Sequence, residues 1–251
     1  MMADHDHAET PDSVVEVGED DDEIVYDPTI AADEDDGEQN DGDDDGTPGK
    51  GDPLVRLYVF LAQEAHRAVI LRRGPSRVWM MATWNVDTDE IQRGQWLKKA
   101  QVYPEKCSVA IDGSRFAYFC VKPHGAIFAF TAVSQPPYWT AQHFSPHTNT
   151  FAGGGAFSPN GTFHELLDHR TVLPPGVTAI GPQLDPTHTE AVDQRGRAVR
   201  IDGGKLYVAS AAPDEWRLLS DFTPDEFVNV APPPQRGGRG AAARRRGANR
   251  T

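Results

Sequence analysis

The distribution of charge along the chain most constrains its fold, because the formal net charge of -14 combines three unlike regions. Residues 1–52 contain 21 Asp and Glu against one Lys, a net charge of -20, and no long apolar run. Such a segment buries too little apolar surface to offset the entropy lost on ordering. The sequence therefore predicts an acidic disordered leader over residues 1–52.

The segment 53–231 is the part of the chain expected to fold. It has 17 acidic and 17 basic residues, and it holds all five Trp, all eleven Phe and both Cys. About 180 residues is a usual size for a single domain with a substantial core. Residues 232–251 contain six Arg and no acidic residue in a Pro, Gly and Ala background. They predict a basic Arg/Gly-rich disordered tail.

Short runs of β-branched and aromatic residues bounded by Gly, Pro, Asn and Asp predict many short strands in the folded segment. The expected strands are 56–61, 68–73, 78–84, 96–103, 107–111, 116–121, 127–133, 139–144, 198–201, 206–209 and 216–219. Strands in this number require more than one sheet. Residues 57–71 and 162–170 also fit an amphipathic helix, the second with a capping box formed by Thr162 and Glu165. We interpret the first as strand, turn and strand.

The clearest predicted hairpin turns at Asp112-Gly113, because Asp-Gly supplies the positive φ angles of a two-residue turn. In this register Cys107 lies opposite Tyr118 and not opposite Cys120, which argues against a disulfide within the hairpin. Two cysteines also fit a reducing compartment.

Turn signals recur at Asp112-Gly113, Asn160-Gly161 and Asp202-Gly203, which are 48 and 42 positions apart. Residues 108–118 and 157–162 resemble the strand–turn–strand repeat of WD40-like and TolB-like β-propellers, whose blades have a period of about 45 residues. The resemblance implies an all-β, antiparallel fold of about three to four propeller-like, blade-sized units, as a complete or incomplete propeller or a twisted stack of sheets. Asp-Gly turns are common in antiparallel proteins, so chance spacing is the alternative.

Four short motifs mark the folded segment: Arg-Gly-Pro-Ser at 73–76, Gly-Gln-Trp at 94–96, Gly-Gly-Gly at 153–155 and Arg-Gly-Arg at 195–197. In this order they resemble the landmarks of a family of uncharacterised bacterial proteins. This resemblance implies no known activity. The three consecutive glycines suit either close approach of a ligand or, by preference, a bulge or close strand packing.

The most suggestive cluster for chemistry is His-Glu-Leu-Leu-Asp-His at residues 164–169. It nearly matches the metalloprotease motif His-Glu-x-x-His, but Asp168 stands where the second histidine is needed on the helix face that binds zinc. His164, Asp168 and His169 are therefore candidate metal ligands, and a solvated helix face or turn is the favoured interpretation. No cofactor is expected.

Other polar pairs favour turns and loops. His143 and His147 are four residues apart, but Pro146 excludes the helix that would align them, so both are expected in a loop. Asp87 and Asp89 are expected to be solvated turn residues. Neither pair predicts a catalytic site.

The Arg-rich tail is the one segment with a physical mechanism for binding. Mobile arginines contact phosphates and release counterions without reading sequence. The candidate nucleic-acid-binding residues are Arg236, Arg239, Arg244, Arg245, Arg246 and Arg250. The negative leader competes for this positive charge, and a purely solubilising tail is the alternative.

Three functional interpretations follow, in order of preference. The first is a non-enzymatic interaction module with an unidentified protein partner. The second is a nucleic-acid-associated accessory protein that binds through the tail, and the third is a metal-dependent hydrolase using residues 164–169. No stretch approaches the roughly 18 apolar residues of a membrane span, and the N-terminus lacks the pattern of a secretory signal. We therefore expect a soluble, intracellular protein without membrane association.

Overall fold

The structure is a computed structural model that describes residues 55–75, 77–168, 170–177, 180–210 and 215–232. The predicted leader and nearly all of the predicted tail lie outside these residues. Within them the fold is all-β and antiparallel, as predicted, with a single 3-10 turn at Pro104–Lys106 as its only helical element. No helix in the described ranges has the length and apolar character needed to cross a membrane.

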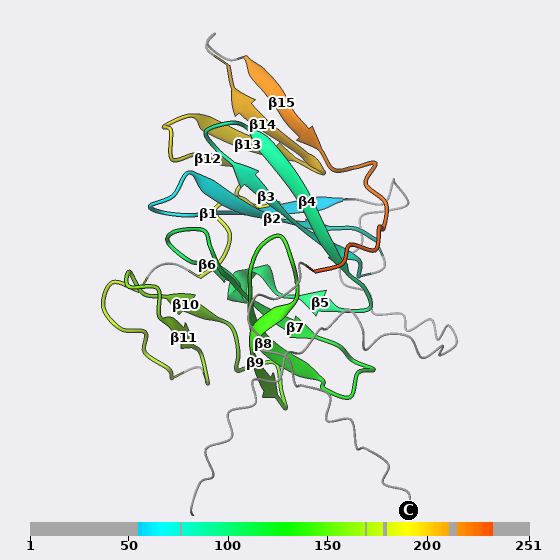
Figure 1. Ribbon diagram of the computed structural model, residues 1–251, viewed down its shortest axis with the longest axis vertical. Helices are drawn as coiled ribbons and strands as arrows, with labels where there is room; N and C mark the ends of the chain where they lie inside the picture. The colour runs from blue at the N-terminus through cyan, green and yellow to red at the C-terminus, as the bar shows by residue number, and fades with distance from the viewer. Residues whose placement is uncertain (1–54, 76, 169, 178–179, 211–214, 233–251) are drawn as a thin grey trace, which may run out of the picture.

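The strands form three stacked sheets and one separate hairpin (Figure 1). The central sheet has the order β1-β2-β3-β4, formed by β1 (Arg56–Leu61), β2 (Arg67–Arg73), β3 (Trp79–Asn85) and β4 (Glu90–Leu97). The lower sheet has the order β5-β7-β8-β9, with β6 also paired to β7, and contains β5 (Gln101–Val102), β6 (Ser108–Val109), β7 (Phe116–Val121), β8 (Ala129–Ser134) and β9 (Ala141–His147).

The β10–β11 hairpin pairs β10 (Gly155–Phe157) with β11 (Phe163–Glu165). The upper sheet has the order β12-β13-β14-β15 and contains β12 (Glu190–Val192), β13 (Ala198–Asp202), β14 (Lys205–Ala209) and β15 (Trp216–Asp221). Figure 1 places the upper sheet on one side of the central sheet and the lower sheet on the other. No sheet in the described part of the chain closes on itself.

The central sheet is buried on both faces. Leu57 and Val59 of β1 pack with the upper sheet, in a core that includes Val199 and Leu206. Phe60 belongs to a second core, shared with the lower sheet. A strand buried on both faces has no polar side to alternate with the apolar one, which explains the continuous apolar runs in β1, β2 and β3.

The landmark Gly-Gln-Trp joins the central and lower sheets. A Cβ atom on Gly94 would lie only 2.1 Å from the carbonyl oxygen of Pro137, so only glycine permits this approach. The buried Oε1 of Gln95 accepts a hydrogen bond from the backbone N–H of Trp139 at 2.7 Å. Trp139 in turn donates its indole N–H to the carbonyl of Gln95 at 3.0 Å. The landmark therefore serves the packing of two sheets.

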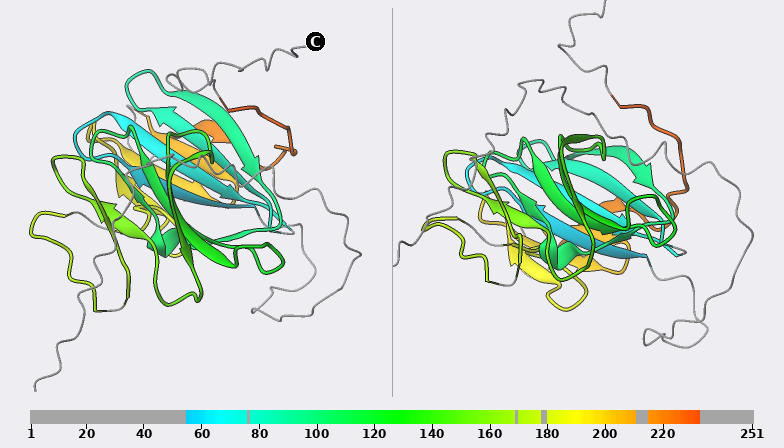
Figure 2. Two further views of the ribbon diagram at one scale, coloured as in Figure 1. Left: turned by 60° about the horizontal axis from the view of Figure 1, so that its bottom comes forward. Right: turned by 90° about the horizontal axis from the view of Figure 1, so that it is seen from below.

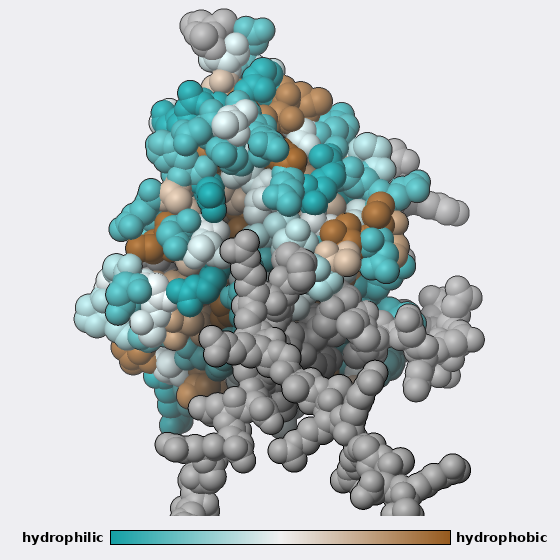
Figure 3. Space-filling model, in the orientation of Figure 1, coloured by the Kyte–Doolittle hydropathy of each residue, from teal (hydrophilic) through white to brown (hydrophobic). Residues whose placement is uncertain are grey.

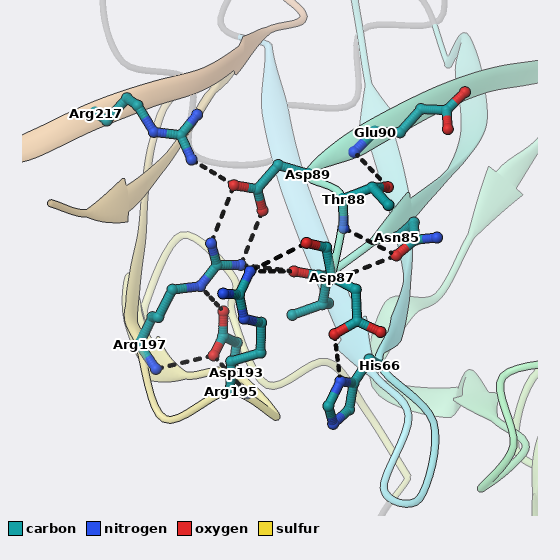
Figure 4. A network of polar contacts seen from close by, with 11 residues as sticks. His66, Asn85, Asp87, Thr88, Asp89, Glu90, Asp193, Arg195, Arg197 and Arg217 are labelled. Carbon is teal, nitrogen blue, oxygen red and sulfur yellow. Dashed lines mark hydrogen bonds and ion pairs between the residues drawn. The ribbon is translucent and has the colours of Figure 1, made fainter.

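The landmark Arg-Gly-Arg joins the central and upper sheets (Figure 4). Arg197, in the β12–β13 turn, donates from both terminal nitrogens to the carboxylate of Asp89 in the β3–β4 turn, at 3.0 and 2.8 Å. Its Nε donates to the fully buried carboxylate of Asp193 at 2.8 Å. Asp89 also accepts a hydrogen bond from Arg217 of β15.

Asp87 and Asp89 lie in a turn, as predicted. The prediction that both are solvated is wrong for Asp89. The side chain of Asp89 is only 19% exposed. Burial of this carboxyl opposes its ionisation, but hydrogen bonds from Arg197 and Arg217 more than offset burial and lower its pKa. Asp87 is exposed and contacts His66 at 2.6 Å.

The three predicted turns lie between paired strands. Ser108 pairs with Ala117, so Cys107 stands opposite Tyr118 as predicted, and both cysteines are free and buried. The loop is longer than the predicted two residues, because Ala110 and Arg115 close it with a backbone hydrogen bond of 2.9 Å. The turn near Asn160-Gly161 joins β10 to β11. At the third position the pairing of Asp202 with Lys205 leaves Gly203 and Gly204 as the turn.

Several predicted boundaries are wrong. The predicted strand 96–103 is broken after Leu97, where Lys99 adopts a positive φ of 51°, and β4 extends back to Glu90. β4 lies at the edge of the central sheet, so its first residues are polar and gave no apolar signal. The helical alternative for residues 57–71 is excluded, because β1 and β2 form the strand, turn and strand that we expected there. That for 162–170 is excluded because Phe163–Glu165 is strand.

Candidate functional site

The β10–β11 hairpin packs against the outer face of the lower sheet, away from the central sheet. Phe157 and Phe163 stack at a centroid distance of 5.3 Å and contact Ala117 and Val133 of the lower sheet. Figure 2 shows the hairpin to one side of the lower sheet in both views. An apolar contact thus places β11 beside β9 and creates a cleft between them.

The three consecutive glycines allow this close packing. A Cβ atom on Gly153 would lie 2.3 Å from the ring of Phe119, and one on Gly154 would lie 2.4 Å from the carbonyl oxygen of Lys106. Both glycines have positive φ angles, 95° and 80°. Our preferred interpretation of this landmark, close strand packing, is therefore the one that the geometry bears out.

Two cations fix the segments around the hairpin. Arg115 donates to the carbonyl of Gly161 at the hairpin turn and lies 5.2 Å from the ring of Phe157. Lys106 donates to three consecutive carbonyls, those of residues 150, 151 and 152, at 2.5, 3.2 and 3.1 Å. Its ammonium lies 4.5 Å from the ring of Phe119, and burial lowers its pKa. These contacts hold the loop before β10 against the sheet.

A cleft of about 410 Å³ opens between β9 and β11. Its walls are formed by Arg115, Val133, Gln142, His143, Phe163 and Glu165. Hydrogen-bond donors, one carboxylate and two apolar side chains therefore face the same space. Such a mixture is typical of sites that bind a polar ligand and orient it by a few hydrogen bonds.

A semi-buried polar cluster adjoins the cleft through Glu165, which lines it. Nε2 of His147 lies 2.8 Å from Oγ1 of Thr131, which also accepts the backbone N–H of Gly154 at 2.8 Å. The same Nε2 lies 3.1 Å from Oε1 of Glu165. That Glu165 oxygen is buried and has no hydrogen-bond partner among the described residues. The contact between His147 and Glu165 is an ion pair only when the imidazole is protonated.

Three strongly exposed apolar side chains lie in the segments next to the hairpin. Phe151, in the loop before β10, is 85% exposed. Leu167 and Val172, which follow β11, are 66% and 89% exposed. Exposed apolar residues that gather on one surface are a feature of protein-interaction sites.

The predicted metal ligands are not brought together. His164 of β11 pairs with Ala156 of β10, and strand alternation turns the His164 side chain to the face opposite Glu165. The carboxylate of Asp168 accepts the backbone N–H of Arg170 at 2.7 Å in an exposed turn. His169 lies outside the described residues. In the parts of the chain that the structure describes, no group of three His, Cys, Asp or Glu side chains is arranged to hold a metal ion.

Sequence reasoning missed the joint placement of two histidines. His143 and His147 were expected in a loop, although His143 also fell within the predicted strand 139–144. Both belong to β9, where alternation places them on the face of the sheet that carries Thr131. Pro146 excludes a helix, as argued, but it is tolerated in an edge strand such as β9. The alternation of His143, Ser145 and His147 was the available signal.

The six candidate arginines of the tail lie outside the described residues. No family model, no curated protein sequence and no solved structure matches this chain. Function is therefore argued from the site alone.

Proposed function

We propose that the chain is a non-enzymatic interaction module that binds a protein segment in the cleft between β9 and β11. The observation that supports this most is the mixed polar and apolar lining of the cleft. Arg115, Gln142 and Glu165 offer donors and an acceptor to a peptide backbone or a polar side chain. Phe163 offers an apolar wall, and exposed Phe151 adds an apolar anchor nearby.

We also propose that the sheets are propeller-type blades. The central and upper sheets are each four-stranded meanders. The lower sheet contains a meander formed by β7, β8 and β9. Stacked meanders and the turn signals repeated at intervals of 48 and 42 residues both support this reading. In this arrangement the lower sheet would be one blade, and the β10–β11 hairpin would cover only part of its outer face. The β9–β11 cleft would lie at the edge of the covered part.

The proposal is tested by selecting binders from a random peptide library displayed on phage, with the full chain immobilised. We expect clones to be enriched whose synthetic peptides bind the full chain in a fluorescence anisotropy titration. The variants His143→Glu and Phe151→Asp should each weaken this binding about tenfold or more, as for loss of a central contact worth at least 1.4 kcal/mol.

Val228→Asp is a matched control, because it adds a charge at an exposed apolar position that lies beyond β15 and does not line the cleft. It should leave peptide affinity unchanged. Failure to enrich any clone, or equal effects of all three substitutions, would refute the assignment of the cleft.

The tail remains a second candidate for binding, by charge alone. The core carries as many acidic as basic residues, so we propose that any affinity for nucleic acid belongs to the six arginines. The hydrolase interpretation has no support in the described residues, because His164 lies in a strand and Asp168 in an exposed turn, and neither belongs to a group of three possible metal ligands.

A further inference from the structure

The upper sheet has one covered face and one open face. Val199, Ile201, Leu206 and Val208 point to the central sheet. Alternation along β13 and β14 therefore turns the intervening residues outward. Six outward side chains are apolar or aromatic: Val192, Ala198, Tyr207, Ala209, Trp216 and Leu218. We call this set the outer face of the upper sheet. Val192 is 64% exposed and Leu218 is 47% exposed, and Figure 3 shows hydrophobic residues at the surface near β15.

An arginine lies at the centre of this face. The guanidinium of Arg200 lies 4.5 Å from the ring of Trp216 and 5.3 Å from that of Tyr207. Its Nε is buried and has no hydrogen-bond acceptor within the described ranges. Glu190 stands opposite Arg200 in the strand pairing, yet the two form no ion pair there. The face thus combines apolar side chains with a fixed cation whose donor lacks an acceptor.

The N-terminal leader is the end of the chain that joins the fold beside this sheet. Val55, the first described residue, lies at the β13–β14 turn, since a Cβ atom on Gly204 would be 2.9 Å from its Cγ1. The C-terminal segment runs elsewhere. Phe222 accepts a hydrogen bond from Arg72 of the central sheet, and Phe227 lies under Lys98 just beyond β4. Figure 1 shows this segment leaving β15 along the end of β4.

Within the leader, residues 23–30 have the composition that would complement the outer face. Their sequence, Glu-Ile-Val-Tyr-Asp-Pro-Thr-Ile, sets apolar and aromatic side chains between carboxylates. Tyr26 and Ile24 suit an apolar sheet face, and Glu23 or Asp27 would supply an acceptor for Arg200. The 24 residues between Ile30 and Val55 span up to about 80 Å when extended, so the connection does not limit reach.

We propose that residues 23–30 of the acidic leader dock on the outer face of the upper sheet, with a leader carboxylate accepting a hydrogen bond from Arg200. This surface lies on a different sheet from the β9–β11 cleft. Tethering gives the segment an effective concentration of about 1 mM, so a Kd of about 100 μM leaves it about 90% docked.

The test uses acrylamide quenching of tryptophan fluorescence in the full chain. Four of the five Trp are 6% exposed or less, so Trp216 on the outer face is the one that a quencher reaches readily. In the double variant Ile24→Asp/Tyr26→Asp the quenching constant should rise severalfold above wild type. Arg200→Gln is assessed by hydrogen exchange and not by quenching, because the guanidinium itself lies 4.5 Å from the Trp216 ring.

The matched control is Val14→Asp/Val15→Asp, which adds the same charge to the leader outside residues 23–30 and should leave quenching at the wild-type value. Hydrogen exchange of the full chain supplies a second measurement, in which amides of residues 23–30 should exchange more slowly in wild type than in Arg200→Gln. Equal quenching in wild type and both double variants, with no protection of residues 23–30, overturns the proposal. Quenching that depends on protein concentration would show that a second copy covers the face, and also overturns it.

Discussion

Replacement of Arg197 by alanine tests how the upper and central sheets are held together. The substitution removes three side-chain hydrogen bonds to carboxylates, two to Asp89 and one to Asp193. It also removes a hydrogen bond of 2.9 Å to the carbonyl of Val86. Asp89 keeps its contact with Arg217, but Asp193 keeps only the backbone N–H groups of Arg195 and residue 197.

The magnitude follows from the burial of the anion left behind. Removing one partner of a buried ion pair costs about 3–5 kcal/mol, because the remaining charge stays desolvated. The side chain of Asp193 is fully buried, but that of Arg197 is 20% exposed. Because the pair is only partly buried, we expect a cost at the lower end of this range, about 3 kcal/mol. Arg217 is 52% exposed, so Arg217→Ala should cost under about 1 kcal/mol, as for a surface ion pair.

Thermal unfolding measures the difference. For a domain of this size, about 3 kcal/mol lowers the midpoint by about 6–12 °C. Arg217→Ala should lower it by about 0–4 °C. If the two variants unfold at the same temperature, or if Arg197→Ala matches wild type, the network does not hold the sheets together.

The same network sets a dependence on pH. The pKa of Asp89 is lower in the folded chain than its ordinary value of 3.8. The stabilisation from this group is therefore complete above that ordinary value and is lost as pH falls through the folded value. The gap in stability between wild type and Arg197→Ala should shrink on acidification below pH 3.8.

Three further results are expected. Gly94→Ala should lower stability by about 1–3 kcal/mol in urea unfolding, since its Cβ would meet the carbonyl of Pro137; wild-type stability would contradict the close approach. Burial raises the pKa of the Cys120 thiol to about 12 and also raises that of Cys107, so neither should react with a thiol reagent at pH 8 until the protein is denatured. Deletion of residues 232–251 should abolish retention on heparin, whereas deletion of the acidic leader should strengthen it; unchanged retention in either would refute the charge argument.

Strands and turns could be predicted from the sequence where their residues lie close together along the chain. β1 was predicted at its observed bounds, and the Cys107–Tyr118 register followed from one Asp-Gly pair. The strands that were missed, β10, β11 and β12, are each only three residues long, too short to show a periodic apolar signal. β10 exists because Gly153 and Gly154 allow it to approach Phe119 and Lys106, contacts between residues distant in sequence.

The cleft was harder to predict than the strands. Glu165 was considered only within a helical motif, and its strand conformation turns it instead toward His147. That meeting requires β11 to pack beside β9, which depends on aromatic contacts of Phe157 and Phe163. Periodicity within either segment carries no information about this pairing.

The two-sided burial of the central sheet has a consequence for how the chain acquires its structure on the ribosome. β1 to β4 are translated first, yet one of their faces is covered only by β12 to β15, near the end of the folded segment. Arg72 of β2 cannot form its hydrogen bond to the carbonyl of Phe222 until that residue, 150 positions later in the chain, has been synthesised. During synthesis the nascent chain therefore carries an uncovered apolar surface until β12 to β15 have been synthesised, which favours chaperone binding. A chain terminated before β12 is expected to aggregate.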